Sequence, residues 1–231
     1  KCGKIRGSGN PAVGFTIPKM WKMLEAKCDF LNRSKLVKEF NEKNFAKKRG
    51  IAMIPIRYGV NVWKKTALVS IFKDGTVIVK HGAMQMGQGC NIKIAQCVAD
   101  VLGSLLEESF PLDRIDFAAF DSHTLSSQTF TGGSTGTEGA AVAAMKACRE
   151  LVESFKPIRD ALKKKASEEA SEGKNSTEVT WAAVCAAAEQ ASLPMSALGH
   201  HGGEKSKDKL AYNCYGVGCS EVELDVLPGE V

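Results

Sequence analysis

The strongest constraint on the fold is an Asp-Gly pair, Asp74-Gly75, that stands between two short runs of β-forming residues. The runs cover 68–72 and 77–79, and the residues between them read Lys-Asp-Gly-Thr. Asp-Gly favours the tight turns whose twist matches that of two paired strands, and between alternating runs it is the strongest short-range signal for a hairpin. We therefore expect a β-hairpin at this point of the chain.

Helical and strand patterns alternate along the rest of the sequence. Apolar residues recur at helical spacing over 18–28, 33–46, 91–103, 137–155 and 179–191. Apolar runs of strand length, continuous or alternating, cover 51–56, 115–120 and 217–227. We expect Pro18 at the start of the first helix, Gly50 at the end of the second, and Thr177 or Thr180 as the N-cap of the last. The alternation predicts an α+β fold in which mixed sheets are flanked by helices.

These patterns suggest a division of the chain into successive parts. We expect a helical N-terminal segment over 1–50, a core with two glycine-rich stretches over 51–159, a charged low-complexity insertion over 160–178, and a helix followed by a strand over 179–231. The Ala, Glu and Lys content of the insertion would allow an exposed helix to continue. Gly173 and Asn175 favour a loop instead, and we expect the preceding helix to stop before Pro157.

The last predicted strand alternates in character. Val222 and Leu224 fall on one side, and Glu221 and Glu223 on the other. Pro228-Gly229-Glu230 then supplies turn chemistry with only Val231 after it. A hairpin without its return strand suggests that the sequence is part of a longer polypeptide.

Composition excludes several classes of protein. With 44% hydrophobic residues the chain can bury a core, but no apolar stretch approaches the ~20 residues of a membrane helix. The net charge is +5. Basic residues form short groups, at 47–49 and 163–165, and these groups lack the interleaved aromatic residues on which nucleic-acid bases stack. We therefore expect neither a membrane nor a nucleic acid as a partner.

The cysteines and histidines do not form a recognisable metal or catalytic motif. The eight cysteines include no CxxC pair and no zinc-type spacing with histidine, and most lie in apolar-periodic segments. This usage favours buried, reduced thiols and a cytoplasmic location. His81 is expected to close a strand, whereas His123, His200 and His201 are expected in polar loops. We assign no catalytic residue and no metal ligand in this chain.

A first glycine-rich stretch, Met86-Gly87-Gln88-Gly89, lies between a predicted strand and a predicted helix. The two glycines allow the backbone to approach a ligand closely. The carboxamide between them offers donors and an acceptor, as needed to recognise a planar heterocycle.

A second stretch, Thr131-Gly132-Gly133-Ser134-Thr135-Gly136-Thr137, leads into the start of another helix. Unpaired amides at a helix N-terminus favour a phosphate or another polar group. Neither stretch matches a Walker A loop or a dinucleotide fingerprint, and for each one a tight turn with an N-cap is an equally acceptable interpretation.

Several ordered motifs give the sequence a family resemblance. They are Gly-Phe-Thr-Ile-Pro at 14–18 with Trp21, Lys-Arg-Gly-Ile-Ala-Met-Ile-Pro at 48–55, Asp-Gly-Thr-Val at 74–77 before the stretch at 86–89, the Ser126-Ser127 loop with 141–142 and 147–148, and Tyr-Gly-Val-Gly-Cys-Ser-Glu-Val-Glu at 215–223. In this order and spacing the chain resembles the molybdenum-binding subunit of the xanthine dehydrogenase/aldehyde oxidase family. The resemblance covers nearly all of the chain outside 160–178 and 202–210.

The resemblance implies an incomplete molybdopterin-binding domain of a molybdenum hydroxylase. In that family a pyranopterin dithiolene holds the molybdenum without a protein ligand, aldehydes or N-heterocycles such as purines are hydroxylated with water, and electrons leave through 2Fe-2S clusters to FAD. Carried over to this sequence, the cofactor-binding residues are Met86, Gly87, Gln88, Gly89, Thr131, Gly132, Gly133 and Ser134. The implied partners are the remaining parts of the hydroxylase on the same or other chains, a small-molecule substrate and a second copy in a homodimer.

The sequence also departs from the family pattern. Gln85 replaces a residue that is usually acidic or similarly polar, and Phe-Thr-Gly-Gly at 130–133 looks more like plant-type aldehyde oxidases than xanthine dehydrogenases. The family's catalytic glutamate lies in a Gly-Glu-Pro-Pro motif that does not occur in this chain. We therefore expect the chain alone to be inactive. A degenerate, non-catalytic relative that acts as a structural or interaction module is the alternative.

Overall fold

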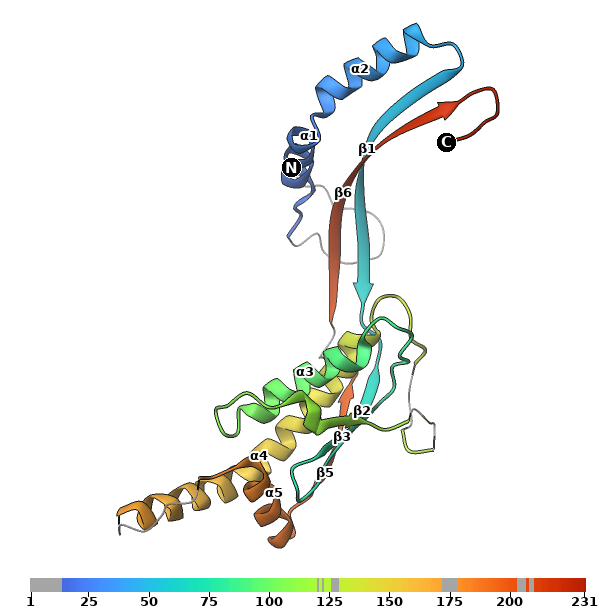
Figure 1. Cartoon of the computed structure of the whole chain (residues 1–231). Helices are drawn as coiled ribbons and strands as arrows, with labels where there is room; N and C mark the ends of the chain where they lie inside the picture. Colours follow the sequence, from blue (N-terminus) through green and yellow to red (C-terminus); the bar gives the residue numbers. More distant parts are fainter. Residues whose placement is uncertain are drawn as a thin grey trace. The chain divides into compact units, whose positions relative to one another are not determined.

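The computed structural model describes residues 14–119, 121, 123–125, 129–171, 178–202, 207 and 210–231. The chain forms two compact units: one contains Lys1–Val60 and Ala211–Val231, and the other contains Asn61–Leu210 (Figure 1). The helices expected within 1–50 share their unit with two long strands. Residues 51–60 therefore belong to this smaller unit and not to the core expected over 51–159.

The larger unit is built on a mixed sheet with the strand order β4-β3-β2-β5. Its strands are β2 (Lys65–Ile71), β3 (Val77–His81), β4 (Ile115–Phe117) and β5 (Ser196–His201). β2 pairs antiparallel with β3 and β5, so that Val69 lies opposite Val79 and Ala197, whereas β3 and β4 run parallel. The expected hairpin is confirmed, because Gly75 lies in the β2–β3 turn with a φ of 87°.

Helices cover one face of this sheet. α3 (Cys90–Gly103) and α4 (Gly136–Ser171) lie across it, α5 (Trp181–Gln190) packs beside α4, and a short 3-10 turn (Leu112–Arg114) precedes β4 (Figure 1). The core between sheet and helices includes Val69, Val79, Ile94, Val98, Leu102, Ala144, Leu151 and Phe155. Each fully buried aliphatic side chain contributes about 1.5–3 kcal/mol, so this layer stabilises the larger unit.

Contact between α4 and β5 depends on small residues. Ala140, Ala143, Ala144 and Ala147 are fully buried on α4. A Cβ placed on Gly199 of β5 would stand 1.9 Å from the carbonyl oxygen of Ala143. Only glycine fits there, because the strand and helix backbones touch directly.

The sequence led us to expect that this helix stops before Pro157. Instead, α4 continues through Pro157 to Ser171. Ile158 and Leu162 pack against the core, and Arg159 Nη1 donates a hydrogen bond of 2.8 Å to the carbonyl oxygen of Leu105. These long-range contacts stabilise the helix beyond the proline, whose missing N–H would otherwise favour an end. Residues 160–171 are therefore helical, and Gly173 and Asn175 lie outside the described residues.

β5 is a strand that the sequence did not predict. His200 and His201 were expected in a polar loop, but both belong to β5, opposite Thr66 and Lys65 of β2. Ala197, Gly199 and His201 alternate as the buried positions of this strand. Pairing with β2 defines the strand, because local composition alone does not favour one at this point.

Other elements agree with the sequence patterns. The strand expected over 115–120 is limited to Ile115–Phe117 within the described residues, which exclude Phe120. Thr180 is the N-cap of α5, where its hydroxyl accepts a hydrogen bond of 3.3 Å from the amide of Ala183. Thr177 and the Ser126-Ser127 pair lie outside the described residues.

The smaller unit is a two-stranded ribbon accompanied by two helices. Its elements are α1 (Ile17–Lys27), α2 (Phe30–Lys43), β1 (Lys47–Asn61) and β6 (Ala211–Asp225). Gly50, expected to end the second helix, lies inside β1. As predicted, Glu221 and Glu223 share one side of β6, where they form ion pairs with Arg33 at 2.6 Å and Arg49 at 2.8 Å.

The described cysteines carry free thiols, and those of Cys90, Cys148 and Cys185 are buried, whereas Cys214 is exposed. A helix with the length and hydropathy needed to cross a bilayer is not found among the described residues.

Candidate functional site

The two glycine-rich stretches lie side by side in the larger unit. Residues 86–89 form the turn between β3 and α3, and residues 131–134 lead into α4. The backbone amide of Met84 donates a hydrogen bond of 2.8 Å to Thr131 Oγ1, which joins the two loops directly. Together they border a hollow of about 320 Å³, within the ~300–1,000 Å³ range of small-molecule pockets. We call this the two-loop hollow; it is lined by Met86, Gln88, Lys93, Thr131, Gly132, Ser134, Thr135, Gly136 and Thr137.

The first loop is shaped by its glycines and by Gln88. Gly87 and Gly89 have φ values of 95° and 74°, which favour glycine, and a Cβ on Gly87 would meet no atom within 4 Å. Gln88 Oε1 accepts a hydrogen bond of 2.6 Å from the amide of Met86, and Gln88 Nε2 donates one of 2.8 Å to the carbonyl oxygen of Met84. The carboxamide therefore closes its own turn, and the second N–H of its nitrogen is the donor it can offer to a ligand.

Gln85 has a structural role at the start of α3. Its Oε1 accepts a hydrogen bond of 3.2 Å from the backbone amide of Asn91. This bond satisfies one of the first amides of α3, which have no acceptor within the helix.

The second loop is packed against an aromatic pair. Trp63 and Phe130 lie with ring centroids 4.4 Å apart. A Cβ on Gly133 would stand 3.1 Å from Trp63 Cη2, and one on Gly132 would stand 2.9 Å from Phe130 Cε2. Gly133 also has a φ of 60°, so close packing and backbone conformation both require glycine there.

The two-loop hollow has a positive character. Lys93 is the cationic side chain among its lining residues, and its Nζ donates a hydrogen bond of 3.1 Å to the carbonyl oxygen of Gln88. The N-terminus of α4 begins at Gly136 on the other side, with amides that have no acceptor within the helix. Buried Thr135 shapes this end, where its Oγ1 donates a hydrogen bond of 3.1 Å to the carbonyl oxygen of Gly132. An anionic group is favoured here.

A neutral histidine supports the root of the first loop. His81 Nδ1 accepts a hydrogen bond of 3.2 Å from the amide of Ala83, and its Nε2 lies 3.1 Å from Asn91 Oδ1. Burial lowers the pKa of His81 below its ordinary value, against the opposing effect of the hydrogen bond with Asn91. At neutral pH the imidazole of His81 is therefore uncharged, and in this form it supports the loop.

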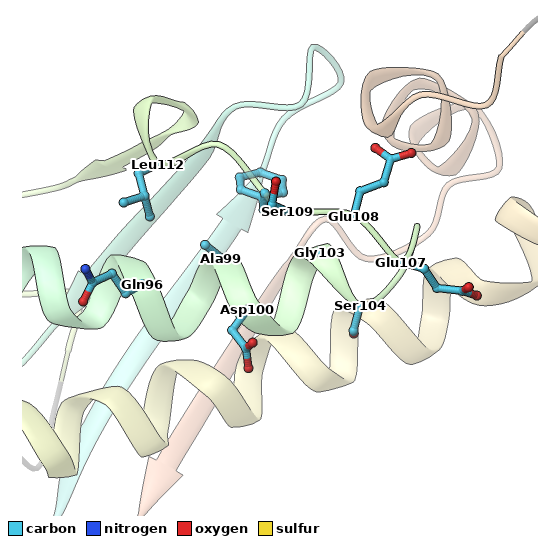
Figure 2. A pocket seen from close by; sticks show the side chains of 10 residues that line it. Gln96, Ala99, Asp100, Gly103, Ser104, Glu107, Glu108, Ser109 and Leu112 are labelled. Atoms are coloured by element: carbon cyan, nitrogen blue, oxygen red, sulfur yellow. The ribbon is translucent and has the colours of Figure 1, made fainter.

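A larger hollow, of about 490 Å³, lies along α3 and the segment that follows it (Figure 2). It carries the carboxylates of Asp100, Glu107 and Glu108, which point in different directions in Figure 2. No group of three or more His, Cys, Asp or Glu side chains placed to hold a metal ion is found in the described part of the chain. Polar groups in this hollow do not converge, so the two-loop hollow is the better candidate for a ligand site.

Comparison with known proteins agrees with the fold and with the motifs. Residues 23–231 match the family described as molybdopterin cofactor-binding domain. The chain belongs to this family. It is 36% identical over 225 residues to an indole-3-acetaldehyde oxidase of Zea mays, with 96% of this chain and 16% of the relative covered. It is also 36% identical over 218 residues to an abscisic-aldehyde oxidase of Arabidopsis thaliana, with 94% of this chain and 16% of that protein covered.

A solved structure shows the same fold. Quinoline 2-oxidoreductase from Pseudomonas putida 86 is 18% identical and superposes with a TM-score of 0.65 over 93% of this molybdopterin-binding domain and 29% of that chain. The expected resemblance to the xanthine dehydrogenase/aldehyde oxidase family and the α+β fold are thus confirmed, and molybdopterin is the cofactor that this family binds. The chain spans about 16% of the length of these aldehyde oxidases.

Within this molybdopterin-binding domain, the structure separates the residues predicted from sequence into two groups. Met86, Gln88, Thr131, Gly132 and Ser134 line the two-loop hollow, whereas Gly87, Gly89 and Gly133 shape the loops without lining it.

Two residues of the site were not predicted from the sequence. Lys93 lines the hollow, and Trp63, two positions before β2, supports the second loop. Lys93 could have been found, because it lies four positions after Gly89 and therefore one helical turn from the loop. No local signal marks Trp63, because its partner loop is distant in the sequence.

Proposed function

We propose that the two-loop hollow holds part of a molybdopterin cofactor in a molybdenum hydroxylase. The observation that carries this proposal is the convergence of the two glycine-rich loops, joined from Met84 to Thr131, on one hollow with a cationic side chain and a helix N-terminus. A hollow of about 320 Å³ between glycine turns suits a flat heterocycle with an anionic tail. The residues present therefore fit the group.

Individual residues have distinct tasks in this proposal. The remaining N–H of Gln88 faces the pterin, and Gly87, with a φ of 95°, shapes the turn that presents it. Lys93 and the first amides of α4 bind the anionic phosphate tail of the cofactor, because a cation and a helix N-terminus are both suited to a phosphate. Ser134, with a φ of 58°, presents its hydroxyl from a turn that the adjacent glycines allow.

When bound, the cofactor supplies a molybdenum centre that hydroxylates an aldehyde or an electron-poor carbon of an N-heterocycle with water as the oxygen source. The protein residues described here bind and orient it. Electron transfer to 2Fe-2S clusters and FAD, the base that acts on the reacting water, and the substrate pocket are assigned to the remaining parts of the hydroxylase.

Apolar surface on both units supports such partners. Ile54 on β1 is 58% exposed, Val222 on β6 is 44% exposed, and Leu198 on the uncovered face of the sheet is 48% exposed. An isolated two-stranded ribbon is marginally stable in water, and contiguous apolar surface marks interaction sites. We propose that other parts of the enzyme cover these faces, in a cytoplasmic assembly that includes a homodimer.

Cofactor content is the direct test. The 231-residue chain is produced in cells that synthesise molybdopterin, purified, and oxidised so that bound pterin is released as a fluorescent product. We expect pterin in the wild-type protein and at least about tenfold less in Gly87→Val and in a Lys93→Glu variant. A branched side chain strains the first loop at the φ of 95° of Gly87, and a reversed charge at Lys93 repels the anionic part of the cofactor.

Lys164→Glu, on an exposed part of α4, is the matched control for the charge reversal and retains the wild-type content. A folded wild-type chain that carries no pterin in such cells, alone or with the rest of the hydroxylase supplied, contradicts the proposal and favours a structural or interaction module.

A further inference from the structure

A fully buried lysine lies beneath the two glycine-rich loops. Lys65, the first residue of β2, is 1% exposed and belongs to the face of the sheet that packs against α4. A Cβ on Gly139 of α4 would stand 2.8 Å from Lys65 Cγ, so a glycine in the helix makes room for the lysine stem. A lysine is rarely placed in a core, because burial of its charge is costly unless every donor is paired.

The ammonium group of Lys65 meets this condition with backbone oxygens from both loop segments. Nζ donates hydrogen bonds to the carbonyl oxygens of Gly82 at 2.9 Å, of Phe130 at 3.2 Å, and of Thr129. A protonated amine has three donors, and the three carbonyls use them all. Gly82 precedes the first glycine-rich loop, and Thr129 and Phe130 precede the second.

The residues next to Lys65 strengthen the same connection. Trp63 packs against Gly133, and the carbonyl oxygen of Lys64 accepts a hydrogen bond of 3.0 Å from Thr129 Oγ1. Burial lowers the pKa of Lys65 below its ordinary range, yet only the charged form supplies the third donor. The start of β2 is therefore organised around the roots of both loops.

We propose that Lys65 is a positioning residue that sets the separation of the two glycine-rich loops and so the shape of the two-loop hollow. The consequence for the cofactor rests on the proposed function, whereas the loop connection itself does not. Lys65 does not line the hollow, so it acts through the backbone of Gly82, Thr129 and Phe130.

Hydrogen exchange of the 231-residue chain tests the loop connection without the cofactor. In Lys65→Met, which keeps an apolar stem but has no donor, amides of 82–89 and 129–136 should exchange about tenfold faster or more, as expected for lost charge-assisted hydrogen bonds. Amides of 140–152, in the buried part of α4, should be unchanged. Lys65→Arg, which retains charge and donors, should restore exchange to within about threefold of wild type. Lys64→Met, at the exposed neighbouring position, is the matched control.

The outcomes decide between positioning and general support. Unchanged exchange in both loop segments of Lys65→Met overturns the proposal, and so does faster exchange that extends through 140–152 in both Lys65 variants. Pterin content is measured on the same samples. If the wild type binds no pterin but the exchange result holds, the loop connection stands and the proposed function fails; if the wild type binds pterin and exchange is unchanged, only the role of Lys65 is wrong.

Discussion

The backbone amide of Met84 donates a hydrogen bond of 2.8 Å to Thr131 Oγ1, although the two residues are 47 positions apart in the chain. This bond connects a loop that follows β3 with a loop that precedes α4. The two glycine-rich segments are therefore parts of one site, and the two-loop hollow depends on contact between them.

Replacement of Thr131 by valine should loosen this connection. Valine keeps the branched shape but has no hydroxyl acceptor, so Met84 N–H loses its partner and the free energy of unfolding should fall by about 0.5–1.5 kcal/mol. Denaturant unfolding measures this change. Thr131→Ser keeps the acceptor and is the control; equal stabilities of the valine and serine variants would contradict the role of the bond.

Replacement of Gly199 by alanine should be severely destabilising. The new methyl group would stand 1.9 Å from the carbonyl oxygen of Ala143, so β5 and α4 must separate. A loss of about 3 kcal/mol or more is expected, since neither backbone can yield cheaply. Gly216→Ala is the matched strand control, because its Cβ would lie 3.6 Å from Ile56, an ordinary contact. Urea midpoints compare the two variants, and a small effect at Gly199 would mean that helix and strand are less closely packed than described.

Replacement of Pro157 by alanine should stabilise the larger unit. The exposed proline lies within α4 and lacks the N–H that would donate to the carbonyl of Glu153. Alanine restores this bond and should raise the free energy of unfolding by about 1–3 kcal/mol. Lys156→Ala, at the preceding position, should change it by less than about 0.5 kcal/mol. Lower thermal stability of Pro157→Ala would show that the proline fits a necessary bend.

Titration of His81 should follow its burial. Because burial lowers its pKa, the midpoint measured by NMR should lie below the ordinary value of 6.5. The unfolded chain then binds the proton more readily than the native protein, so stability is lost as the pH falls below about 6.5. His81→Gln should lack this part of the pH dependence between pH 7 and 5. A midpoint at or above 6.5 would be inconsistent with a neutral, buried imidazole.

Thiol reactivity should separate the cysteines by burial. Among the cysteines that the structure describes, exposed Cys214 should react first with iodoacetamide in the native protein. Burial raises the pKa of Cys148 and of Cys185 to about 12, so these thiols should react only after unfolding. Peptide mapping by mass spectrometry, with a sample in guanidinium as the control, gives the order. Modification of native Cys148 at the rate of Cys214 would contradict this packing.

Local signals were sufficient for much of the fold. Asp74-Gly75 identified the hairpin because turn and strands are adjacent, and the N-cap of α5 was narrowed to Thr177 or Thr180, of which the structure shows Thr180. β5 was missed because His200 and His201 become strand residues through pairing with β2. The continuation of α4 beyond Pro157 was missed for a similar reason, since Ile158 and Leu162 are held by the distant core.

The candidate site shows the same limit. Glycine content pointed to both loops, but their convergence depends on the Met84–Thr131 bond, which no local pattern reports. Lys65 resembles any surface lysine in the sequence, and only the folded chain shows that it is buried and paired with three carbonyl oxygens.

The direct contact of Gly199 with the backbone of Ala143 has a mechanical consequence. At this point the backbones of β5 and α4 meet without a side chain between them, so we expect α4 to resist sliding along the strand. We therefore expect the wall of the two-loop hollow formed by the start of α4 to be rigid. The opposite wall is a glycine turn closed by the Gln88 carboxamide, and we expect it to adjust when a ligand binds. The backbone of the turn at 86–89 would thus change its conformation to fit different ligands, whereas the start of α4 would keep its position.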